Sequence, residues 1–444
     1  MTETRTPDRS TLVLKGGLVL SMDESVGIRD GCDVAIRDGR IVDVGPALHL
    51  EGAEEVDASQ MMVIPGLVES HFHMWSCLGR NFISEGYEYF PAKWATSAVY
   101  EPDDFYNSVL LGLVEAANAG ITTVHNWSHN TRTPEHADAE LSAHRDGLVR
   151  ARYAYGHRDM LPEDEPLGFA DIDRVADEWF SAGSPFDGTV HLGINLRGPD
   201  LGTLEVFHKE MDEVRARGLP VAIHTVQGGS TKVRATDLAA RDYLGPDFMI
   251  AHFLAATAED RAIMASTRTP LSFSVHSELR LGDAGDPRAA LLGMVRAGVD
   301  VSLSIDATSL HPVNLFEAMN VAWNMGIPWE RTDTESLQAL SFQECLAMAT
   351  INGARALGLA DVTGSLTPGK RADVVLLRKH DLNVAPVGDP MSTVVRAMAP
   401  ANVDTVIIDG RVVKKDGQLL HVDVAEVVRN AERSAHRILE RSGS

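Results

Sequence analysis

In the middle of the chain, short apolar runs alternate with stretches whose apolar residues have helical spacing. The apolar runs predict eight strands, at residues 62–71, 121–125, 150–156, 189–196, 220–225, 248–253, 270–275 and 299–305. The stretch 102–119 is typical of the intervening helices, because acidic residues fill its first turn and Gly120 follows its last. Eight strand–helix repeats over about 300 residues predict an α/β fold, a (β/α)8 barrel of the TIM type.

The two ends of the chain have a different pattern, with polar and apolar residues alternating over short runs. Asp38-Gly39 separates two such runs near the N-terminus and Asp409-Gly410 separates two near the C-terminus, as in tight β-hairpins. We therefore predict that the terminal segments fold together into one small β-sandwich. The predicted units are residues 1–62 and 368–421 for the two parts of the sandwich, 63–367 for the barrel and 422–444 for a C-terminal helix.

The composition is typical of a globular enzyme, with 444 residues of which 44% are hydrophobic and 23% charged. A formal net charge of −23 argues against nucleic acid or an anionic membrane as a partner. No apolar stretch approaches the ~18–20 residues of a membrane span, and the three cysteines are too scattered for a disulfide scaffold. We expect a cytoplasmic protein that acts on a small molecule.

Polar residues interrupt the predicted strands near their carboxyl ends, where the active sites of such barrels lie. His71 and His73 are one residue apart in VESHFHMW, so both side chains lie on the same face of the first strand. Other strands end in His125, His224, His252 and Asp306. Each residue alone has an ordinary structural explanation, but several imidazoles and a carboxylate at one rim predict a metal site.

Longer motifs around these residues resemble the amidohydrolase superfamily, in the branch that contains cytosine deaminase and the triazine and guanine hydrolases. The motifs are IPGLVESHFH, GITTVH, SLSID, SFQECLAMATINGARALGL, GSLTPGKRADVVLL and TVIIDGRVV. The resemblance extends over nearly the whole chain and implies the barrel and the terminal sandwich.

The resemblance also implies a metal centre. The implied ligands of one divalent metal ion per subunit are His71, His73, His224 and Asp306. Zinc is expected, with iron, cobalt or manganese as alternatives. His252 would donate a hydrogen bond to the bound water or the substrate. Two-metal relatives bridge their ions with a carboxylated lysine after the fourth strand, but no lysine lies between Lys93 and Lys209, so we expect one ion.

This set of ligands suits hydrolysis. Three neutral imidazoles leave the ion enough positive charge to lower the pKa of its bound water from ~15.7 towards ~7. Asp306 would accept a proton from that water and pass it to the leaving group. The water would then attack an sp² carbon that carries nitrogen or another leaving group.

The chain departs from this branch at three places. Its deaminases have a glutamate three residues after the strand-five histidine, where this chain has Gln227, whose amide cannot shuttle a proton. After the seventh strand, Glu278 replaces an asparagine and His276 lies nearby. The end of the second strand adds His125 and His129 to the predicted site.

Two further residues are candidates for substrate contacts. Trp75 would either line the substrate pocket or pack a loop onto the barrel mouth. Arg197 would either pair with a substrate carboxylate or fix its own loop. The predicted substrate-binding residues are therefore Trp75, His125, His129, Arg197, His276 and Glu278. The predicted catalytic residues are Asp306, His252 and Gln227.

Three functions are compatible with these residues. The main hypothesis is a mononuclear metal-dependent hydrolase that cleaves a non-peptide carbon–nitrogen bond in a small organic molecule, such as an amide, urea or carbamate. It is preferred because Gln227 removes the family's general acid, and an acid elsewhere would need the right position as well as a charge. The alternative is a deaminase of an aminated heteroaromatic ring, of the aminopyrimidine, purine or triazine type. In that case Glu278 or a loop acid replaces the glutamate that shuttles protons in the family's deaminases. A non-catalytic paralogue is disfavoured by the complete set of ligands. Relatives commonly pair, so we expect a homodimer or a higher homo-oligomer.

Overall fold

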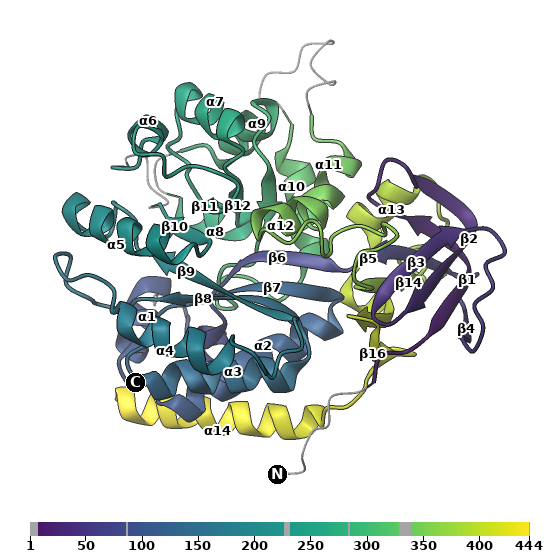
Figure 1. The fold of residues 1–444 in the computed structure, drawn as a ribbon, viewed down its shortest axis with the longest axis horizontal. Coiled ribbons are helices and arrows are strands. Elements are labelled where there is room, and N and C mark those ends of the chain that lie inside the picture. Colours follow the sequence, from purple (N-terminus) through teal and green to yellow (C-terminus); the bar gives the residue numbers. More distant parts are fainter. Residues whose placement is uncertain (1–7, 86–87, 226–230, 283–284, 328–338, 444) are drawn as a thin grey trace.

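The structure is a computed structural model that describes residues 8–85, 88–225, 231–282, 285–327 and 339–443. Within these residues, an eight-stranded parallel barrel lies beside a nine-stranded mixed sheet (Figure 1). The predicted fold class is confirmed, since the expected sandwich of both termini corresponds to the nine-stranded sheet.

The barrel strands follow one another in chain order, each parallel to the next. They are β6 (Leu67–Phe72), β7 (Ile121–Ser128), β8 (Arg150–Gly156), β9 (Val190–Leu196), β10 (Val221–His224), β11 (Phe248–Ala251), β12 (Leu271–Phe273) and β13 (Val301–Leu303). The helices between and after them are η1 (Met74–Gly79), α1 (Tyr89–Ser97), α2 (Pro102–Asn118), α3 (Pro134–Gly147), α4 (Phe169–Trp179), α5 (Leu204–Arg217), α6 (Ala235–Ala239), α7 (Ala258–Thr267), α8 (Val275–Leu281), α9 (Pro287–Arg296), α10 (Leu315–Met325), α11 (Phe342–Met348) and α12 (Ile351–Ala356).

The barrel closes where the end of β6 meets the residues after β13. Phe72 and Asp306 form an isolated parallel bridge. The backbone N–H of His73 donates to the carbonyl oxygen of Asp306 at 2.8 Å, and the N–H of Asp306 donates to the carbonyl oxygen of His71 at 2.9 Å. Barrel closure therefore brings three of the predicted metal ligands together.

The terminal sheet combines strands from both ends of the chain. Its strands are β1 (Leu12–Leu20), β2 (Ile28–Arg37), β3 (Arg40–Gly45), β4 (Glu54–Asp57), β5 (Met61–Pro65), β14 (Val374–Arg378), β15 (Val403–Ile408), β16 (Arg411–Lys415) and β17 (Gln418–Leu419). Their order is β17-β16-β15-β14-β5-β1-β2-β3, with β4 beside β1. The antiparallel pair of β5 and β14 joins the N-terminal strands to the C-terminal ones.

Asp-Gly pairs form tight turns in this sheet, as predicted. Asp38 and Gly39 connect β2 to β3 with φ angles of 52° and 74°. Asp409 and Gly410 connect β15 to β16 with φ angles of 53° and 76°. Two successive left-handed residues are the signature of a type I′ turn, whose twist matches that of the flanking strands.

The sequence predicts one strand at 62–71, but the structure has two. The chain turns at Gly66, so β5 lies in the terminal sheet and β6 in the barrel. A Cβ atom at Gly66 would overlap the side chain of Thr122. Only glycine lets the chain pass so close to β7, and this turn links the two sheets.

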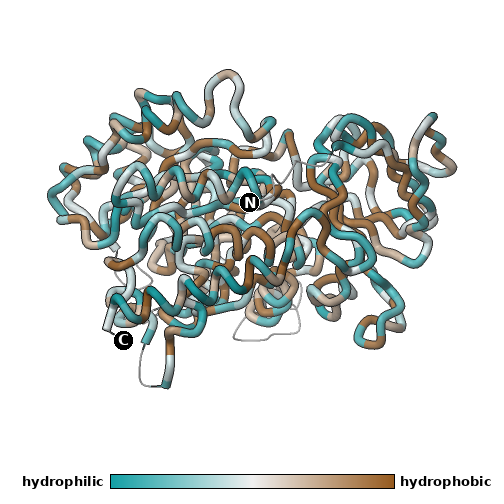
Figure 2. Tube along the Cα trace, turned by 90° about the horizontal axis from the view of Figure 1, so that it is seen from below, coloured by the Kyte–Doolittle hydropathy of each residue, from teal (hydrophilic) through white to brown (hydrophobic). Residues whose placement is uncertain are grey.

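Apolar segments run through the middle of the barrel and of the terminal sheet, and polar segments lie mainly at the periphery (Figure 2). The terminal sheet has its own group of buried apolar side chains, which includes Leu14, Val34 and Val374. None of the described helices combines the length and the apolar character that a membrane-spanning helix needs.

The C-terminal helix, α14 (Val424–Ser442), lies along α2 (Figure 1). Arg437 and Arg441 both pair with the buried Asp104 of α2. Ile438 joins the apolar cluster around Trp75, which follows β6. The helix therefore supports the first loop of the barrel mouth from outside.

Two more short helices, α13 (Pro390–Ala397) and η3 (Pro400–Asn402), lie between β14 and β15.

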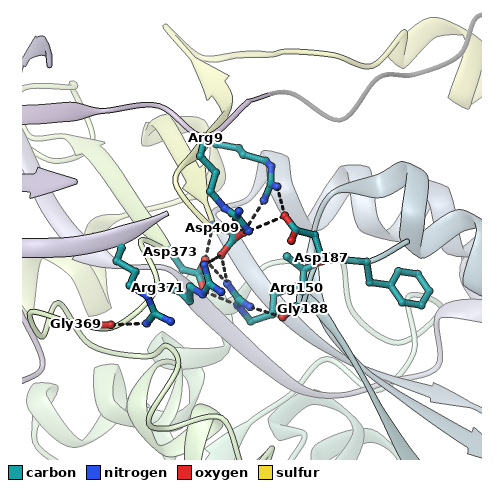
Figure 3. Close-up of polar contacts among 12 residues, drawn as sticks. Arg9, Arg150, Asp187, Gly188, Gly369, Arg371, Asp373 and Asp409 are labelled. Atoms are coloured by element: carbon teal, nitrogen blue, oxygen red, sulfur yellow. Dashed lines mark hydrogen bonds and ion pairs between the residues drawn. The ribbon is translucent and has the colours of Figure 1, made fainter. Parts of the chain in front are cut away.

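Buried ion pairs join the barrel to the terminal sheet (Figure 3). Arg150, at the start of β8, donates to both carboxylate oxygens of Asp373, at 2.7 and 3.2 Å, and also contacts Asp409 at 3.4 Å. These three side chains are fully buried. The other guanidinium groups that contact Asp409 are those of Arg9, Arg371 and Arg411.

Candidate metal centre

Four side chains meet at the carboxyl ends of β6, β10 and β13. Nε2 of His71 lies 3.2 Å from Nε2 of His224 and 3.4 Å from Oδ1 of Asp306. Nε2 of His73 lies 3.2 Å from the same carboxylate oxygen. His224 is half-buried and the other three residues are buried. The structure thus brings together the four residues that the sequence predicts as metal ligands.

The spacing and charge of these atoms fit a bound cation. Ligand atoms around a tetrahedral ion with bonds of about 2.0–2.1 Å lie about 3.3 Å apart, and the separations here are 3.2–3.4 Å. Burial lowers the pKa of His71 to about 3 and that of His73 to about 4, so both imidazoles are neutral. Burial alone would raise the pKa of Asp306, but hydrogen bonds from both histidines hold it well below its usual value. Zinc prefers such a set of imidazoles and carboxylate.

Two residues of the site have left-handed backbone conformations. The φ angles are 67° for Asp306 and 72° for His252. Such conformations cost on the order of 1–3 kcal/mol for residues other than glycine, and they are concentrated at functional sites. Here they direct both side chains towards His71, because ligand atoms of the three residues lie within 4.8 Å of one another.

His252 is oriented by Glu278, which is fully buried on α8. Nδ1 of His252 lies 3.0 and 3.1 Å from the two carboxylate oxygens, one of which also accepts the backbone N–H of Ser274 at 3.0 Å. The His252 ring lies parallel to that of His224, with centroids 5.4 Å apart. Burial lowers the pKa of His252, but the charge and hydrogen bond of Glu278 outweigh burial, so the pKa is raised. An imidazole paired with a carboxylate can hold and pass a proton.

Trp127 and Glu69 support the metal ligands. The Trp127 ring is fully buried, and its centroid lies 4.0 Å from that of His224 and 4.4 Å from that of His71. Glu69 accepts hydrogen bonds from the backbone N–H groups of His71 at 3.0 Å and Ile305 at 2.9 Å, which ties β6 to the end of β13. Burial raises the pKa of Glu69 to about 8. Sequence reasoning missed Glu69, although strand alternation places it on the same face as the two histidines that follow it.

Trp75 and His129 contact each other next to His73. The indole N–H of Trp75 donates to Nδ1 of His129 at 3.0 Å. The rings of His129 and His73 meet edge to face, with centroids 4.5 Å apart. Nε2 of His129 lies 3.2 Å from the carboxylate of Asp159, which also pairs with Lys93. Sequence reasoning did not include Asp159 or Lys93, which extend the polar site beyond the ligands.

Two of the predicted substrate-binding residues have other partners. Strand β7 continues to Ser128, so His125 lies within the strand, where its Nε2 is 3.2 Å from Oδ1 of Asn195. His125 also lines a cavity of about 290 Å³ together with residues around the start of β10. Arg197 donates to three backbone carbonyls of the loop 161–165, so its guanidinium group holds that loop in place.

The last two predicted residues are His276 and Gln227. His276 lies in the first turn of α8, and its ring stacks on that of His311 with centroids 3.5 Å apart. Gln227 belongs to the segment 226–230, which is outside the described residues.

Comparison with known proteins identifies relatives over the full length of the chain. Residues 62–413 match the model of the amidohydrolase family. A 5′-deoxyadenosine deaminase of Methanosarcina barkeri is 25% identical over 451 residues, which cover 97% of this chain and 99% of the relative. A 5-methylthioadenosine/S-adenosylhomocysteine deaminase of Pelotomaculum thermopropionicum is 28% identical over 456 residues, which cover 97% and 100%.

Two solved structures share the fold. An adenosine deaminase from Xanthomonas campestris with bound zinc has a TM-score of 0.80 at 21% identity and covers 98% of this chain and 99% of its own. An atrazine chlorohydrolase from Arthrobacter aurescens TC1 in complex with zinc has a TM-score of 0.78 at 20% identity, with coverages of 96% and 100%. Both structures therefore combine this barrel with bound zinc.

Proposed function

Because the chain belongs to the amidohydrolase family, we propose that it removes the amino group from the adenine ring of a nucleoside by metal-dependent hydrolysis. The convergence of three neutral imidazoles and one carboxylate at the barrel mouth carries this proposal. The full-length similarity to deaminases of 5′-modified adenosines favours this substrate class. Ring deamination, the alternative from the sequence, is thus better supported than hydrolysis of an amide, urea or carbamate.

Asp306 is the residue placed to accept the proton of the attacking water. A divalent ion held by His71, His73, His224 and Asp306 would supply an activated water and positive charge near the reacting carbon. Both contacts of Asp306 with His71 and His73 use Oδ1, which leaves Oδ2 for the proton. The bridge between Phe72 and Asp306 holds the carboxylate in this position.

His252 and Glu278 are the residues that we assign to the second proton transfer. Deamination requires a proton on the ring and another on the departing ammonia, and an amide at Gln227 cannot supply one. Glu278 holds Nδ1 of His252 at 3.0 Å, so the imidazole keeps a single orientation beside the metal ligands. We propose that this pair replaces the glutamate that the family's deaminases have at the position of Gln227.

A second candidate function is hydrolysis of a bond to a leaving group other than a ring amine. Gln227 favours it, because a leaving group that departs as an anion does not need the missing acid. A chlorinated triazine meets this condition, whereas a urea or a carbamate, whose amine leaves only after protonation, would still need an acid such as His252.

The two functions can be separated by measuring ammonia. Zinc-loaded protein is incubated with adenosine, 5′-deoxyadenosine and 5′-methylthioadenosine, and in parallel with a chlorotriazine and a phenylurea. We expect ammonia from at least one adenine nucleoside, no activity in His224→Ala and full activity in Lys209→Ala, which alters only an exposed ion pair. Products from the triazine or urea, without ammonia from any nucleoside, would support the second function instead.

A further inference from the structure

We propose a second divalent-metal site at the barrel mouth, formed by His276, His311 and Glu317. His276 lies on α8 directly after β12, His311 lies in the segment after β13, and Glu317 lies in the first turn of α10. Because β12 and β13 are adjacent parallel strands, their carboxyl ends bring these segments together. One ligand atom from each residue lies within 4.8 Å of the others. None of the three residues belongs to the metal centre described above.

The carboxylate of Glu317 faces both imidazoles. Oε1 lies 3.9 Å from Nε2 of His276, and Oε2 lies 3.5 Å from Nε2 of His311. These gaps exceed the ~2.7–3.2 Å of N–H···O hydrogen bonds. The gap to His311 is close to the ~3.3 Å that separates ligand atoms around tetrahedral zinc, and the gap to His276 is longer. The corresponding separations at the first candidate metal centre are shorter, at 3.2–3.4 Å, so Glu317 and His276 would have to approach each other on binding.

The environment of His311 independently supports a cation at this site. The residue is only 3% exposed, and neither of its ring nitrogens makes a hydrogen bond to the part of the chain that the structure describes. Buried polar atoms without a partner are uncommon in folded proteins and indicate an ion or water that completes the site. Burial lowers the pKa of His311 to about 3, so its imidazole is neutral and able to coordinate a cation.

The two rings have to move when an ion binds. They are stacked with centroids 3.5 Å apart and planes inclined by 22°, whereas coordination requires each nitrogen lone pair to point at the ion. Rotation about the Cβ–Cγ bonds would open the stack, and Glu317 can follow because its side chain is 51% exposed. Two imidazoles and a carboxylate suit zinc and similar ions, and they leave a coordination position for water or a ligand oxygen.

Zinc content per chain tests the proposal. The protein is equilibrated with excess zinc, freed of unbound zinc and analysed by mass spectrometry for metals. We expect two equivalents for the unmodified protein, and one for each of His311→Ala, Glu317→Gln and His224→Ala. The double variant His224→Ala/Glu317→Gln should retain none. The control His208→Ala should retain two, because it removes another histidine with a ring nitrogen that has no hydrogen bond among the described residues.

One equivalent in the unmodified protein, or two in Glu317→Gln, would overturn the proposal. Anomalous diffraction at the zinc edge then locates the second ion, and a peak away from these three residues would mean an adventitious ion only. Glu317→Gln changes an exposed side chain, so the fold should persist, which thermal melting followed by circular dichroism checks. The measurement counts metal, so its outcome does not depend on whether the protein is a deaminase.

Discussion

At the scale of single residues, Asp306 serves both the fold and the metal centre. Its backbone closes the barrel against Phe72, and its side chain contacts two histidines. We expect Asp306→Asn to lower kcat/KM by about 100- to 10,000-fold, because the amide cannot accept a proton. Asparagine tolerates the left-handed backbone, so thermal melting should detect a folded protein. A variant that keeps most of its activity in steady-state assays would contradict the assigned role.

Glu278 should act on the rate through His252. We expect Glu278→Gln to lower kcat by about 10- to 100-fold with little change in KM, since comparable supporting residues contribute factors of this size. The pH profile of kcat should also change, because the variant alters the charge that faces the imidazole. Ser277→Ala is a matched control, as it alters a neighbouring buried hydroxyl that makes no hydrogen bond to any described residue. Equal effects of both variants on stability and kcat would indicate a packing role instead.

The convergence of the four candidate metal ligands could be predicted from the sequence because each comes at a strand end with a recognisable motif. His252, Glu278, Trp75 and His129 also lie beside them, as the sequence suggested. The contacts of Arg197 and Glu69 could not be predicted, because their partners are far away in the chain. Arg197 follows β9, but its hydrogen bonds go to the loop 161–165. Glu69 accepts the N–H of Ile305, which is 236 residues away in the sequence but adjacent in space because the barrel closes there.

At the scale of elements, the predicted strands are present but some of their ends differ. β8 has the predicted bounds, whereas β7 continues beyond His125 to Ser128. The extension exists because Trp127 and Ser128 pair with Ala154 and Tyr155 of β8. Such pairing depends on the neighbouring strand, so the apolar pattern of β7 alone could not indicate it. As a result Trp127, rather than His125, lies against the metal ligands.

Trp127 should be important for both stability and metal binding. We expect Trp127→Ala to reduce the free energy of unfolding by about 3–5 kcal/mol and to weaken zinc binding, because it leaves a cavity against His71 and His224. Urea denaturation and zinc titration measure the two effects. Trp94→Ala, at an exposed position, should leave both nearly unchanged. Unaltered zinc affinity in Trp127→Ala would exclude a supporting role for the indole.

Glu140 should make the stability of the contact between α3 and β7 depend on pH. Burial raises the pKa of Glu140 from 4.5 to about 8, although Asn126 donates a hydrogen bond to it at 2.6 Å. The folded protein therefore binds this proton more tightly than the unfolded chain does. The resulting stabilisation is complete below pH 4.5 and is lost as the pH rises towards 8.

Urea denaturation at several pH values can test this dependence. The free energy of unfolding of the unmodified protein should fall, relative to that of Glu140→Gln, by on the order of a few kcal/mol between pH 5 and pH 8. Parallel curves for the two proteins would show that Glu140 does not titrate in this range.

At the scale of the whole molecule, the two sheets depend on each other through the buried ion pairs of Arg150. We expect Arg150→Met to reduce the free energy of unfolding by about 3–5 kcal/mol, because it leaves the buried carboxylates of Asp373 and Asp409 with less compensation. Lys209→Ala removes an exposed ion pair and should change the free energy of unfolding by less than about 1 kcal/mol. Similar urea midpoints for both variants would show that the ion pairs do not hold the sheets together.

The joining of the two chain ends could be predicted, because both carry alternating strands and Asp-Gly turns. The ion pairs between the sheets could not, since Arg150 and Asp373 belong to segments with no shared pattern. The choice of substrate is equally hidden, because it depends on loops after the strands, whose conformations are set by tertiary contacts.

The bridge between Phe72 and Asp306 also has a consequence for biosynthesis. The ribosome releases His71 with the first strand of the barrel, but Asp306 appears only after the eighth strand has been made. A nascent chain therefore carries two histidines with no carboxylate to complete their metal centre. The terminal sheet is completed even later, because β14, the antiparallel neighbour of β5, follows the barrel in the sequence. The candidate metal centre can accordingly be complete only late in synthesis, after most of the polypeptide has emerged.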